Sequence, residues 1–368
     1  MKILVLNYEY PPLGGGASPV SQEIAHQYVK HGHRVDVVTM GYGDLPQQEN
    51  DQGVNVYRVK CWRSKKEICH PWEQLSYLRA AWPVCRKLVQ ENNYDFCHCH
   101  FIIPTGILAR QIKKKYGLDY IITCHGSDVP GYNPDRFKLL HKFTGPILKK
   151  VAKDARWLAC PSLYLISLIK KNISSQLQNL VHIPNGFDLD KFHPQTKTKT
   201  ILSAGRLLER KGFHYLIKAV SDQDLDYQVH ICGDGPMMPK LKELALHSKT
   251  KIVLHGWLDN KSKTYRDLFE QAAIYCLVSE KENASIALLE AMAAGCAVIT
   301  SDVAGCPETV GEAGILVPPD NLELLVKTLK KLIKNPDRLT NLQKQARNRT
   351  EQVFDWNKVI NQYLKILN

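Results

Sequence analysis

Short apolar runs alternate with longer helical segments along most of the chain. The first run, residues 3–6, is typical of a strand buried on both faces, and residues 19–31 after it have the spacing of a helix. This alternation predicts parallel sheets that are covered by helices on both sides. In the first half we predict strands at 3–6, 34–39, 54–59, 96–100, 120–124, 157–160 and 181–183.

The alternation stops once and then resumes. Residues 192–200 are polar and without periodicity, and we interpret them as an interdomain linker. Further strands are predicted at 201–204, 227–232, 252–254, 274–278, 298–300 and 315–317. We therefore predict two α/β domains, 1–194 and 195–352, each with a doubly wound parallel sheet. A terminal amphipathic helix within 353–368 is expected to pack on the first domain, because its apolar residues have helical spacing: Phe354, Trp356, Val359, Ile360, Tyr363, Leu364 and Leu367.

Ligands of open parallel sheets bind beyond the carboxyl ends of the strands, so the residues that follow the predicted strands are candidates for a site. In the first half these are Gly14, Gly15, Gly16, His100, His125, Asp128 and Asn185. The three glycines lie between a strand and a helix, so their backbone can approach a ligand closely. Their spacing does not match a dinucleotide-binding fingerprint.

Two glutamates flank the predicted start of a helix in the second half. Glu282 lies in the loop after strand 274–278, Ser285 is a suitable N-cap, and Glu290 falls in the second turn of helix 286–294. Such a helix end attracts phosphate, and the carboxylates beside it can bind hydroxyl groups. The pair alone also has a simpler interpretation, because glutamate near a helix start suits the helix dipole.

Two cations follow the first strand of the second half. Arg206 and Lys211 lie between Gly205 and Gly212, at the sheet edge where a ligand is expected. A guanidinium and an ammonium group can together hold a diphosphate. Either cation alone would be an ordinary surface charge, but together with the glycine turn and the two glutamates they indicate an anion site.

Composition and cysteine usage narrow the class of protein. Hydrophobic residues make up 44% and charged residues 23% of the chain, as in globular proteins. No signal peptide or membrane-spanning run is recognisable, so we expect a cytoplasmic protein. The eleven cysteines fall mostly in predicted strands, which favours reduced, buried thiols. In Cys97-His98-Cys99-His100, strand alternation sends cysteines and histidines to opposite faces, which argues against a zinc site.

The charge distribution suggests anionic partners. The net charge is +13, and residues 1–190 carry 24 Lys and Arg against 16 Asp and Glu. A basic surface attracts the phosphates of nucleotides, nucleic acids or lipids, but no nucleic-acid-binding motif is present, so nucleic acid is not an expected partner. Aromatic and basic residues in 72–87 and 137–150 leave open a peripheral attachment to the inner face of an anionic membrane. We favour the alternative that the apolar members of these segments belong to the core; they include Trp72, Leu75, Leu78 and Trp82, with Arg79, Arg86 and Lys87 beside them.

Taken in order, the motifs resemble those of the retaining glycosyltransferases of family 4, the sucrose-synthase-like family with the GT-B fold. The matching segments are Gly205-Arg206, Lys211-Gly212, Gly233-Asp234-Gly235-Pro236, His255-Gly256 and residues 282–295, preceded by residues 14–16, 125–128 and 185–188. The resemblance spans essentially the whole chain. It implies two Rossmann-like domains, the first binding an acceptor and the second a nucleotide-diphosphate sugar.

The resemblance also implies roles for individual residues. Arg206 and Lys211 would hold the donor diphosphate, Glu290 the ribose and Glu282 the donor sugar. His125 would be the active-site histidine at the sugar, so the catalytic set is His125, Glu282, Arg206 and Lys211, with His100, Asp128 and Asn185 in the vicinity. Further donor contacts would come from Gly14, Gly15, Gly16, Gly233, His255, Gly256, Trp257, Ser285, Ile286, Ala287 and Leu288.

The implied reaction retains the anomeric configuration and needs no metal or other cofactor. The acceptor, a glycan, a lipid-linked molecule or a small molecule, would give its proton to the departing phosphate. Where many members have Gly-Phe-Gly after the first glutamate, this chain has Asn283-Ala284-Ser285, which predicts a changed sugar pocket. A sugar-nucleotide epimerase or a phosphorylase on the same fold remains an alternative. So does a metal-dependent transferase that would use the Asp-x-Asp triplets at 188–190 and 224–226.

Overall fold

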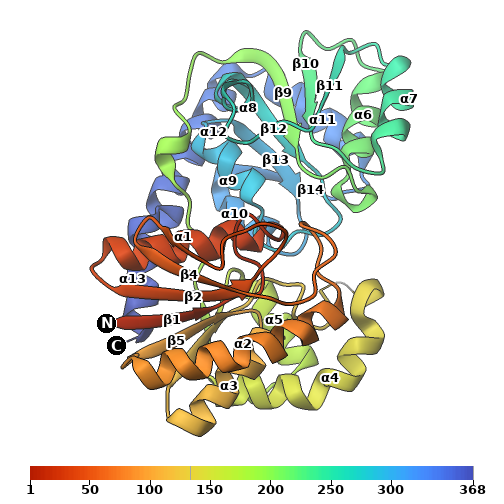
Figure 1. Ribbon diagram of the computed structural model, residues 1–368. Coiled ribbons are helices and arrows are strands. Elements are labelled where there is room, and N and C mark those ends of the chain that lie inside the picture. Colours follow the sequence, from red (N-terminus) through yellow and green to blue (C-terminus); the bar gives the residue numbers. More distant parts are fainter. Residues whose placement is uncertain (133, 368) are drawn as a thin grey trace. The chain divides into compact units, whose positions relative to one another are not determined.

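The chain divides into two compact units, which are described separately. The computed structural model describes the backbone of residues 1–132 and 134–367, and the side chains of residues 1–132 and 144–367. Unit 1 contains Met1–Pro184 and the segment from Val359 onward, and unit 2 contains Asn185–Lys358. We predicted the boundary after residue 194, whereas the division falls after Pro184. Each unit is a sheet with helices on both faces (Figure 1), which confirms the prediction of two Rossmann-like domains.

Unit 1 is built on an eight-stranded sheet with the order β3-β4-β2-β1-β5-β6-β7-β8. Neighbouring strands are parallel, except for β3 and β4. The strands are β1 (Lys2–Leu6), β2 (Arg34–Met40), β3 (Gln48–Asp51), β4 (Val54–Val59), β5 (Phe96–His100), β6 (Tyr120–Thr123), β7 (Trp157–Cys160) and β8 (Leu180–His182). The helices are α1 (Ala17–Lys30), α2 (Pro71–Glu91), α3 (Thr105–Tyr116), α4 (Pro134–Asp154), α5 (Leu163–Asn172) and, at the end of the chain, α13 (Trp356–Leu367).

Strand β5 alternates between the two faces of this sheet as predicted. Cys97 and Cys99 join the hydrophobic cluster that includes residues of α2 and α3. His98 stacks on His100, with ring centroids 4.6 Å apart, and lies 5.5 Å from the ring of Tyr363 on α13. The terminal helix therefore packs on unit 1, and the Tyr363 hydroxyl lies 3.1 Å from the Thr123 hydroxyl. All eleven cysteines are free thiols, and all but Cys61 are buried.

Strand β3 was not predicted. It pairs antiparallel with β4 through a hairpin whose turn residues, Gln52 and Gly53, both have positive φ. Its sequence, Gln-Glu-Asn-Asp, contains no apolar residue, because it lies at the edge of the sheet and buries no face in the core.

Unit 2 contains a six-stranded parallel sheet with the order β11-β10-β9-β12-β13-β14. The strands are β9 (Thr198–Ala204), β10 (Gln228–Cys232), β11 (Ile252–Gly256), β12 (Ala272–Leu277), β13 (Ala297–Ser301) and β14 (Gly314–Val317). The α-helices are α6 (Phe213–Ser221), α7 (Met238–Leu246), α8 (Lys263–Gln271), α9 (Ile286–Ala293), α10 (Cys306–Val310), α11 (Leu322–Ile333) and α12 (Pro336–Arg349). Single turns occur at η1 (Leu189–Lys191), η2 (Glu209–Lys211), η3 (Gly311–Ala313) and η4 (Thr350–Phe354).

The predicted linker, residues 192–200, is instead part of unit 2. Phe192 is buried in its core, and Glu270 accepts hydrogen bonds from the His193 amide at 2.8 Å and the Gln195 side chain at 2.6 Å. Strand β9 already begins at Thr198. The polar side chains that suggested a linker are mostly exposed, and Gln195 and Lys197 attach the segment to Glu270 of α8.

Each sheet has a point where the strand order reverses. In unit 1 this switch point lies between β1 and β5, and in unit 2 it lies between β9 and β12. Loops that leave two adjacent strands in opposite directions open a crevice at such a point. The segments after β1 and β5 contain Gly14 and those after β9 and β12 contain Arg206, Lys211 and Glu282. In the described part of the chain, no helix is both long and apolar enough to cross a membrane.

Candidate functional site

The loop after β9 is pressed against the end of β12. Gly212 has a φ of +73°, and a Cβ atom there would overlap the carbonyl of Val278. A backbone hydrogen bond also joins the loops after β9 and β12, since the Glu280 amide donates to the Arg210 carbonyl at 2.8 Å. Only glycine permits both this conformation and this approach. Lys211, at the end of η2, therefore lies beside the loop that contains Glu282.

Lys211 and Glu282 form an ion pair at the switch point. The Lys211 ammonium contacts Glu282 Oε1, and the Ser279 hydroxyl lies 3.4 Å from the same oxygen. The two side chains are mostly buried, with 19% and 9% of their surface exposed. Truncating one member would leave the other as an unpaired buried charge, at a cost of about 3–5 kcal/mol. The pair thus holds a cation and a carboxylate, both predicted donor-binding groups, at one place.

Arg206 differs from Lys211 in its surroundings. Its side chain is exposed and makes no ion pair or hydrogen bond with a residue that the structure describes. Its backbone is well fixed, because the Gly205 amide donates to Cys232 and the Leu207 amide donates to Asp234, both at 2.9 Å. A guanidinium on a rigid loop with no internal partner is available to an anion.

The loops after β9, β10 and β11 are joined through glycine backbones. Gly233 has a φ of +140°, and a Cβ atom there would overlap the Gly205 carbonyl. The Gly233 amide in turn donates to the Gly256 carbonyl at 2.8 Å. His255 contacts His230 between ring nitrogens at 3.0 Å, and burial lowers the pKa of both. Trp257, next to them, is 72% exposed.

Helix α9 begins at the predicted place but is not capped as predicted. Ser285 occupies the N-cap position with an extended backbone, yet its side chain accepts no hydrogen bond from the helix amides. The loop before it is instead fixed by Gly305, whose amide donates to the Glu282 carbonyl at 2.8 Å and which leaves no room for a Cβ atom beside Asn283. The amides of Ile286, Ala287 and Leu288 are therefore not satisfied by a side-chain cap.

The side chain of Glu290 is buried. It accepts a hydrogen bond from the Tyr265 hydroxyl on α8 at 2.9 Å. Burial raises the pKa of Glu290 to about 7, while the Tyr265 hydrogen bond and the charge of Lys191 act in the opposite direction. Glu290 was predicted from the sequence and Tyr265 was not, because the spacing of α8 identifies a buried face without showing which side chain can reach Glu290 with a polar group.

The predicted histidines of unit 1 lie together. His125 Nε2 is 3.0 Å from His100 Nδ1, and the two rings are stacked with centroids 5.3 Å apart. Asp128 is buried and accepts hydrogen bonds from the amides of His125, Gly126 and Ile102 at 2.9–3.0 Å. Burial raises the pKa of Asp128, although the hydrogen bonds from these amides act in the opposite direction. Asp128 thus fixes the loop after β6, and His125 is held from its ring and from its backbone.

The three glycines after β1 form an open turn. Gly14 has a φ of +95° and donates its amide to the Lys66 carbonyl at 2.9 Å. A Cβ atom on Gly15 or Gly16 would meet no described atom within 4 Å. Helix α1 follows directly, and Gly16 provides no side-chain cap. The backbone of Gly15 and Gly16 is thus accessible, whereas a Cβ atom on Gly14 would overlap the side chain of Glu9.

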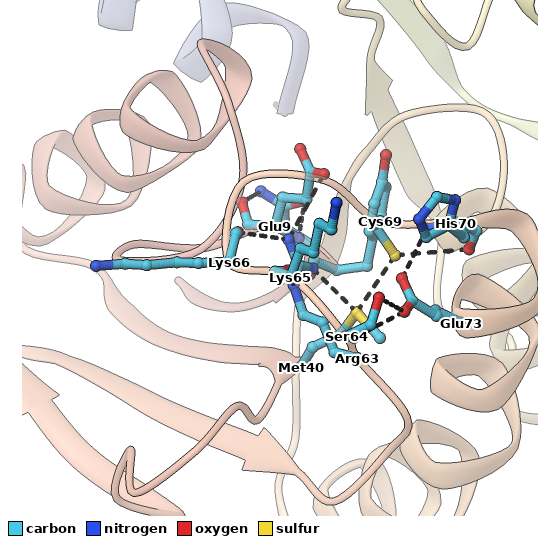
Figure 2. Close-up of polar contacts among 11 residues, drawn as sticks. Glu9, Met40, Arg63, Ser64, Lys65, Lys66, Cys69, His70 and Glu73 are labelled. Atoms are coloured by element: carbon cyan, nitrogen blue, oxygen red, sulfur yellow. Dashed lines mark hydrogen bonds and ion pairs between the residues drawn. The ribbon is translucent and has the colours of Figure 1, made fainter. Parts of the chain in front are cut away.

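The segment that supports this glycine turn was missed by sequence analysis. Arg63 is buried and donates to the carbonyls of Lys65 at 3.0 Å and Lys66 at 2.9 Å (Figure 2). Glu73 accepts hydrogen bonds from the amides of Ser64 and His70, both at 2.7 Å. These bonds, with that of the Ser64 hydroxyl, lower the pKa of Glu73 in spite of its burial. Arg63 lies in an irregular loop without periodicity, and Glu73 lies in the first turn of α2, where a glutamate also suits the helix dipole. The sequence therefore could not separate these two residues from surface charges.

Asn185 and the two Asp-x-Asp triplets all belong to unit 2. Asn185 is the first residue of unit 2, so it does not belong to the same unit as the histidines. In the Asp-x-Asp triplets, Asp188 caps η1 by accepting from the Asp190 amide, and Asp226 pairs with Lys199. Within the described residues, no group of three or more His, Cys, Asp or Glu side chains is arranged to hold a metal ion.

Comparison with known proteins identifies relatives over the whole chain. Residues 14–191 match the model of Glycosyltransferase Family 4, and residues 187–349 match that of Glycosyl transferases group 1. An uncharacterized glycosyltransferase of Methanocaldococcus jannaschii is 29% identical over 357 residues, which are 87% of this chain and 86% of that protein.

Solved structures show the same fold. Sucrose-phosphate synthase from Thermosynechococcus elongatus superposes with a TM-score of 0.82 at 19% identity, covering 100% of this chain and 98% of that one. HepE of Anabaena in complex with UDP gives 0.78 at 17% identity, covering 100% and 99%. The expectation of a GT-B fold is therefore confirmed.

Glu290 should impose a pH dependence on stability. Its pKa is about 7 in the folded chain and 4.5 for the free group, so between these values the folded state retains a proton that the unfolded state has lost. The free energy of unfolding therefore falls as the pH rises from about 4.5 to 7, by up to ~3 kcal/mol. Replacement by glutamine (Glu290→Gln) removes this loss. Urea unfolding at pH 5, 6, 7 and 8 should show the variant gaining on the wild type as the pH rises.

The control for this measurement is Glu243→Gln, which changes an exposed carboxylate on α7. Its stability should follow the wild-type curve. A constant difference between Glu290→Gln and the wild type across this pH range would contradict the assignment of a buried, proton-retaining carboxyl group.

Proposed function

Because the chain belongs to the glycosyltransferases of family 4, we propose that it transfers a sugar from a nucleotide-diphosphate sugar to an acceptor hydroxyl group with retention of configuration. The observation that carries the proposal is the switch point of unit 2. There, Lys211 is paired with Glu282 on adjoining loops, and Arg206 on the same loop as Lys211 has no ionic partner among the described residues.

The diphosphate of the donor is assigned to Arg206, Lys211 and the start of α9. Two cations neutralise the charge that develops on the leaving group, and uncapped helix amides add a dipole of the same sign. A Cβ atom on Gly233 would overlap the Gly205 carbonyl, so glycine lets the loops after β9 and β10 pack closely beside Arg206. HepE of Anabaena, which has the same fold, binds UDP and UDP-glucose, and this supports a nucleotide sugar as the donor.

The ribose and the base are assigned to neighbouring loops. Glu290 would accept hydrogen bonds from the ribose hydroxyls, and the hydroxyl of Tyr265 now occupies one of its oxygens. The residues after β11, His255, Gly256 and Trp257, would face the base, with the exposed Trp257 ring available for stacking.

The sugar would lie against Glu282, with its pocket shaped by the residues that follow. Asn283 and Ser285 are buried, and Gly305 packs on the carbonyl of Asn283. A loop that is fixed from behind in this way favours one donor sugar over others.

Departure of the nucleoside diphosphate would leave oxocarbenium character on the sugar. The acceptor hydroxyl would attack from the face that the leaving group vacates and pass its proton to a departing phosphate oxygen, so no side chain acts as a nucleophile. Arg206 and Lys211 would stabilise the developing negative charge. His125 would orient the donor sugar.

An epimerase or a phosphorylase would use the same fold differently. An epimerase would change or release the sugar without an acceptor, and a phosphorylase would carry a pyridoxal group with its own absorbance. Incubation of donor without acceptor and an absorbance spectrum separate these activities from transfer.

Arg206 provides the cleanest test of the proposed function. Arg206→Ala removes a guanidinium that has no internal partner, so transfer should fall by about 10²-fold or more while the melting temperature stays near that of the wild type. The assay is release of nucleoside diphosphate from a panel of nucleotide sugars. Lys218→Ala, which removes an exposed cation from α6, should retain full activity. Wild-type turnover in Arg206→Ala would overturn the assignment.

A second partner, an anionic membrane, is favoured by one surface of unit 1. Trp62, Trp72 and Leu75 are 66%, 53% and 62% exposed, and we call them the aromatic surface. Trp72 and Leu75 lie one turn apart on α2, and the backbone of Trp62 is bonded to the Ser76 hydroxyl at 3.0 and 3.2 Å.

Two exposed lysines follow Trp62 closely in the sequence. Lys65 and Lys66 are exposed on the loop that Arg63 anchors, and the Lys66 side chain extends away from the anchored cluster (Figure 2). Exposed tryptophan next to lysine suits the headgroup region of an anionic bilayer. We propose that this surface attaches the protein to the cytoplasmic face of a membrane, which would suit a lipid-linked acceptor.

The favoured interpretation, that the apolar residues of 72–87 belong to the core, is confirmed for Leu78 and Trp82, which are partly buried and pack against the core of unit 1. It is wrong for Trp72 and Leu75, which are exposed. The side chains of residues 137–143, part of the second predicted segment, lie outside those that the structure describes.

Vesicle flotation tests this attachment. The wild type should float with vesicles that contain phosphatidylglycerol and much less with pure phosphatidylcholine. Trp62→Ser combined with Trp72→Ser should lose most of this binding, and loss of each lysine should cost about 1 kcal/mol. Leu246→Ser, which removes an 80% exposed side chain from unit 2, is the control. Equal flotation of the double variant and the wild type would contradict the proposal, and retention on a glycan column instead would indicate a carbohydrate-binding surface.

A further inference from the structure

His100 is buried, and the proposed function gives it no task. Its Nδ1 lies 3.0 Å from Nε2 of His125. Its Nε2 is also buried and has no hydrogen-bond partner among the described residues. A buried ring nitrogen without a partner is unusual and calls for an explanation.

Both rings are neutral near pH 7. Burial lowers the pKa of His125 to about 3. Burial, followed by repulsion from His98 and His125, lowers the pKa of His100 well below its ordinary value. Each ring therefore carries a single proton, and the contact between them needs one donor nitrogen and one acceptor nitrogen.

Two arrangements of these protons are possible. If His125 donates from Nε2, the proton of His100 must sit on its own Nε2, which leaves a buried N–H group without a partner. If His100 donates from Nδ1, its Nε2 is a bare acceptor. Buried N–H groups without a partner are rarer in proteins than buried acceptors without one, so the second arrangement is favoured.

We infer that His100 is a positioning residue that holds His125 in the tautomer protonated on Nδ1. The Nε2 lone pair of His125 is then occupied by the His100 N–H group, and Nδ1 already carries a proton. His125 can donate a hydrogen bond to a sugar hydroxyl but has no free lone pair with which to accept a proton. This inference deepens the proposed function and rests on it for the identity of the ligand: it makes His125 a hydrogen-bond donor and excludes it as a general base.

The position of His100 is itself well fixed. Its carbonyl accepts a hydrogen bond from the Thr105 hydroxyl, and its ring stacks on His98 at 4.6 Å. His98 is held between the Tyr28 hydroxyl at 3.0 Å and the Thr123 hydroxyl at 2.8 Å. A ring that is braced in this way can fix the orientation of its neighbour.

The tautomer can be measured directly in the intact wild-type chain. Long-range proton–nitrogen correlation spectra of protein labelled with ¹⁵N-histidine distinguish protonated from bare ring nitrogens, and a His125→Asn variant assigns the signals. The inference requires a protonated Nδ1 and a bare Nε2 on His125 at pH 7. A protonated Nε2, or an even mixture of tautomers, would overturn it. This result is independent of whether any nucleotide sugar is turned over, so it can fail or succeed separately from the proposed function.

His100→Phe then removes the hydrogen bond and keeps a ring in the stack. His125 should lose its single tautomer, and KM for the donor should rise roughly tenfold, the equivalent of one hydrogen bond, with a smaller change in kcat. His182→Phe, which changes an exposed histidine on β8 of the same unit, is the control and should leave the tautomer unchanged. An unaltered His125 spectrum in folded His100→Phe would refute the positioning role.

Discussion

The candidate site depends on one constraint, the parallel direction of neighbouring strands. Because all carboxyl ends in a parallel sheet lie at one edge, loops that are far apart in the sequence end at the same place. In unit 2 the order reverses between β9 and β12, so Lys211 and Glu282, 71 residues apart, become ionic partners. Gly212 makes the contact possible, since any side chain there would overlap the carbonyl of Val278, directly after β12. The same rule places the accessible glycine turn of unit 1 after β1.

The free-energy cost of burying polar groups at these sheet edges is reduced in two ways. Charged groups are paired or surrounded by amides, as for Lys211 with Glu282 and for Asp128 with its three amide donors. Histidines are instead held neutral, since burial lowers the pKa of both His100 and His125. Arg206 is the exception, because it is exposed and has no ionic partner among the described residues. Because the other charged groups are paired and the histidines are neutral, the guanidinium of Arg206 is available to bind an anionic ligand.

Sequence patterns predicted what depends on periodicity and on strand ends. Buried parallel strands such as β12 are uninterrupted apolar runs, and the residues after them could be identified from strand positions alone. The patterns gave wrong predictions where polar segments are part of the folded units. Strand β3 contains no apolar residue, and Phe192 is a buried residue in a polar stretch. They also could not show which neighbour satisfies a group. Ser285 has the chemistry of a cap but does not act as one, and Tyr265 reaches Glu290 from a helix 25 residues away.

The central claim is that unit 2 holds a nucleoside diphosphate through its own side chains and helix amides. Calorimetric titration of the wild type with UDP, GDP and ADP, with and without EDTA, tests it most directly. We expect that at least one of them binds and that its affinity is the same in EDTA. Absence of binding by all three, or binding that disappears when divalent cations are removed, would contradict it.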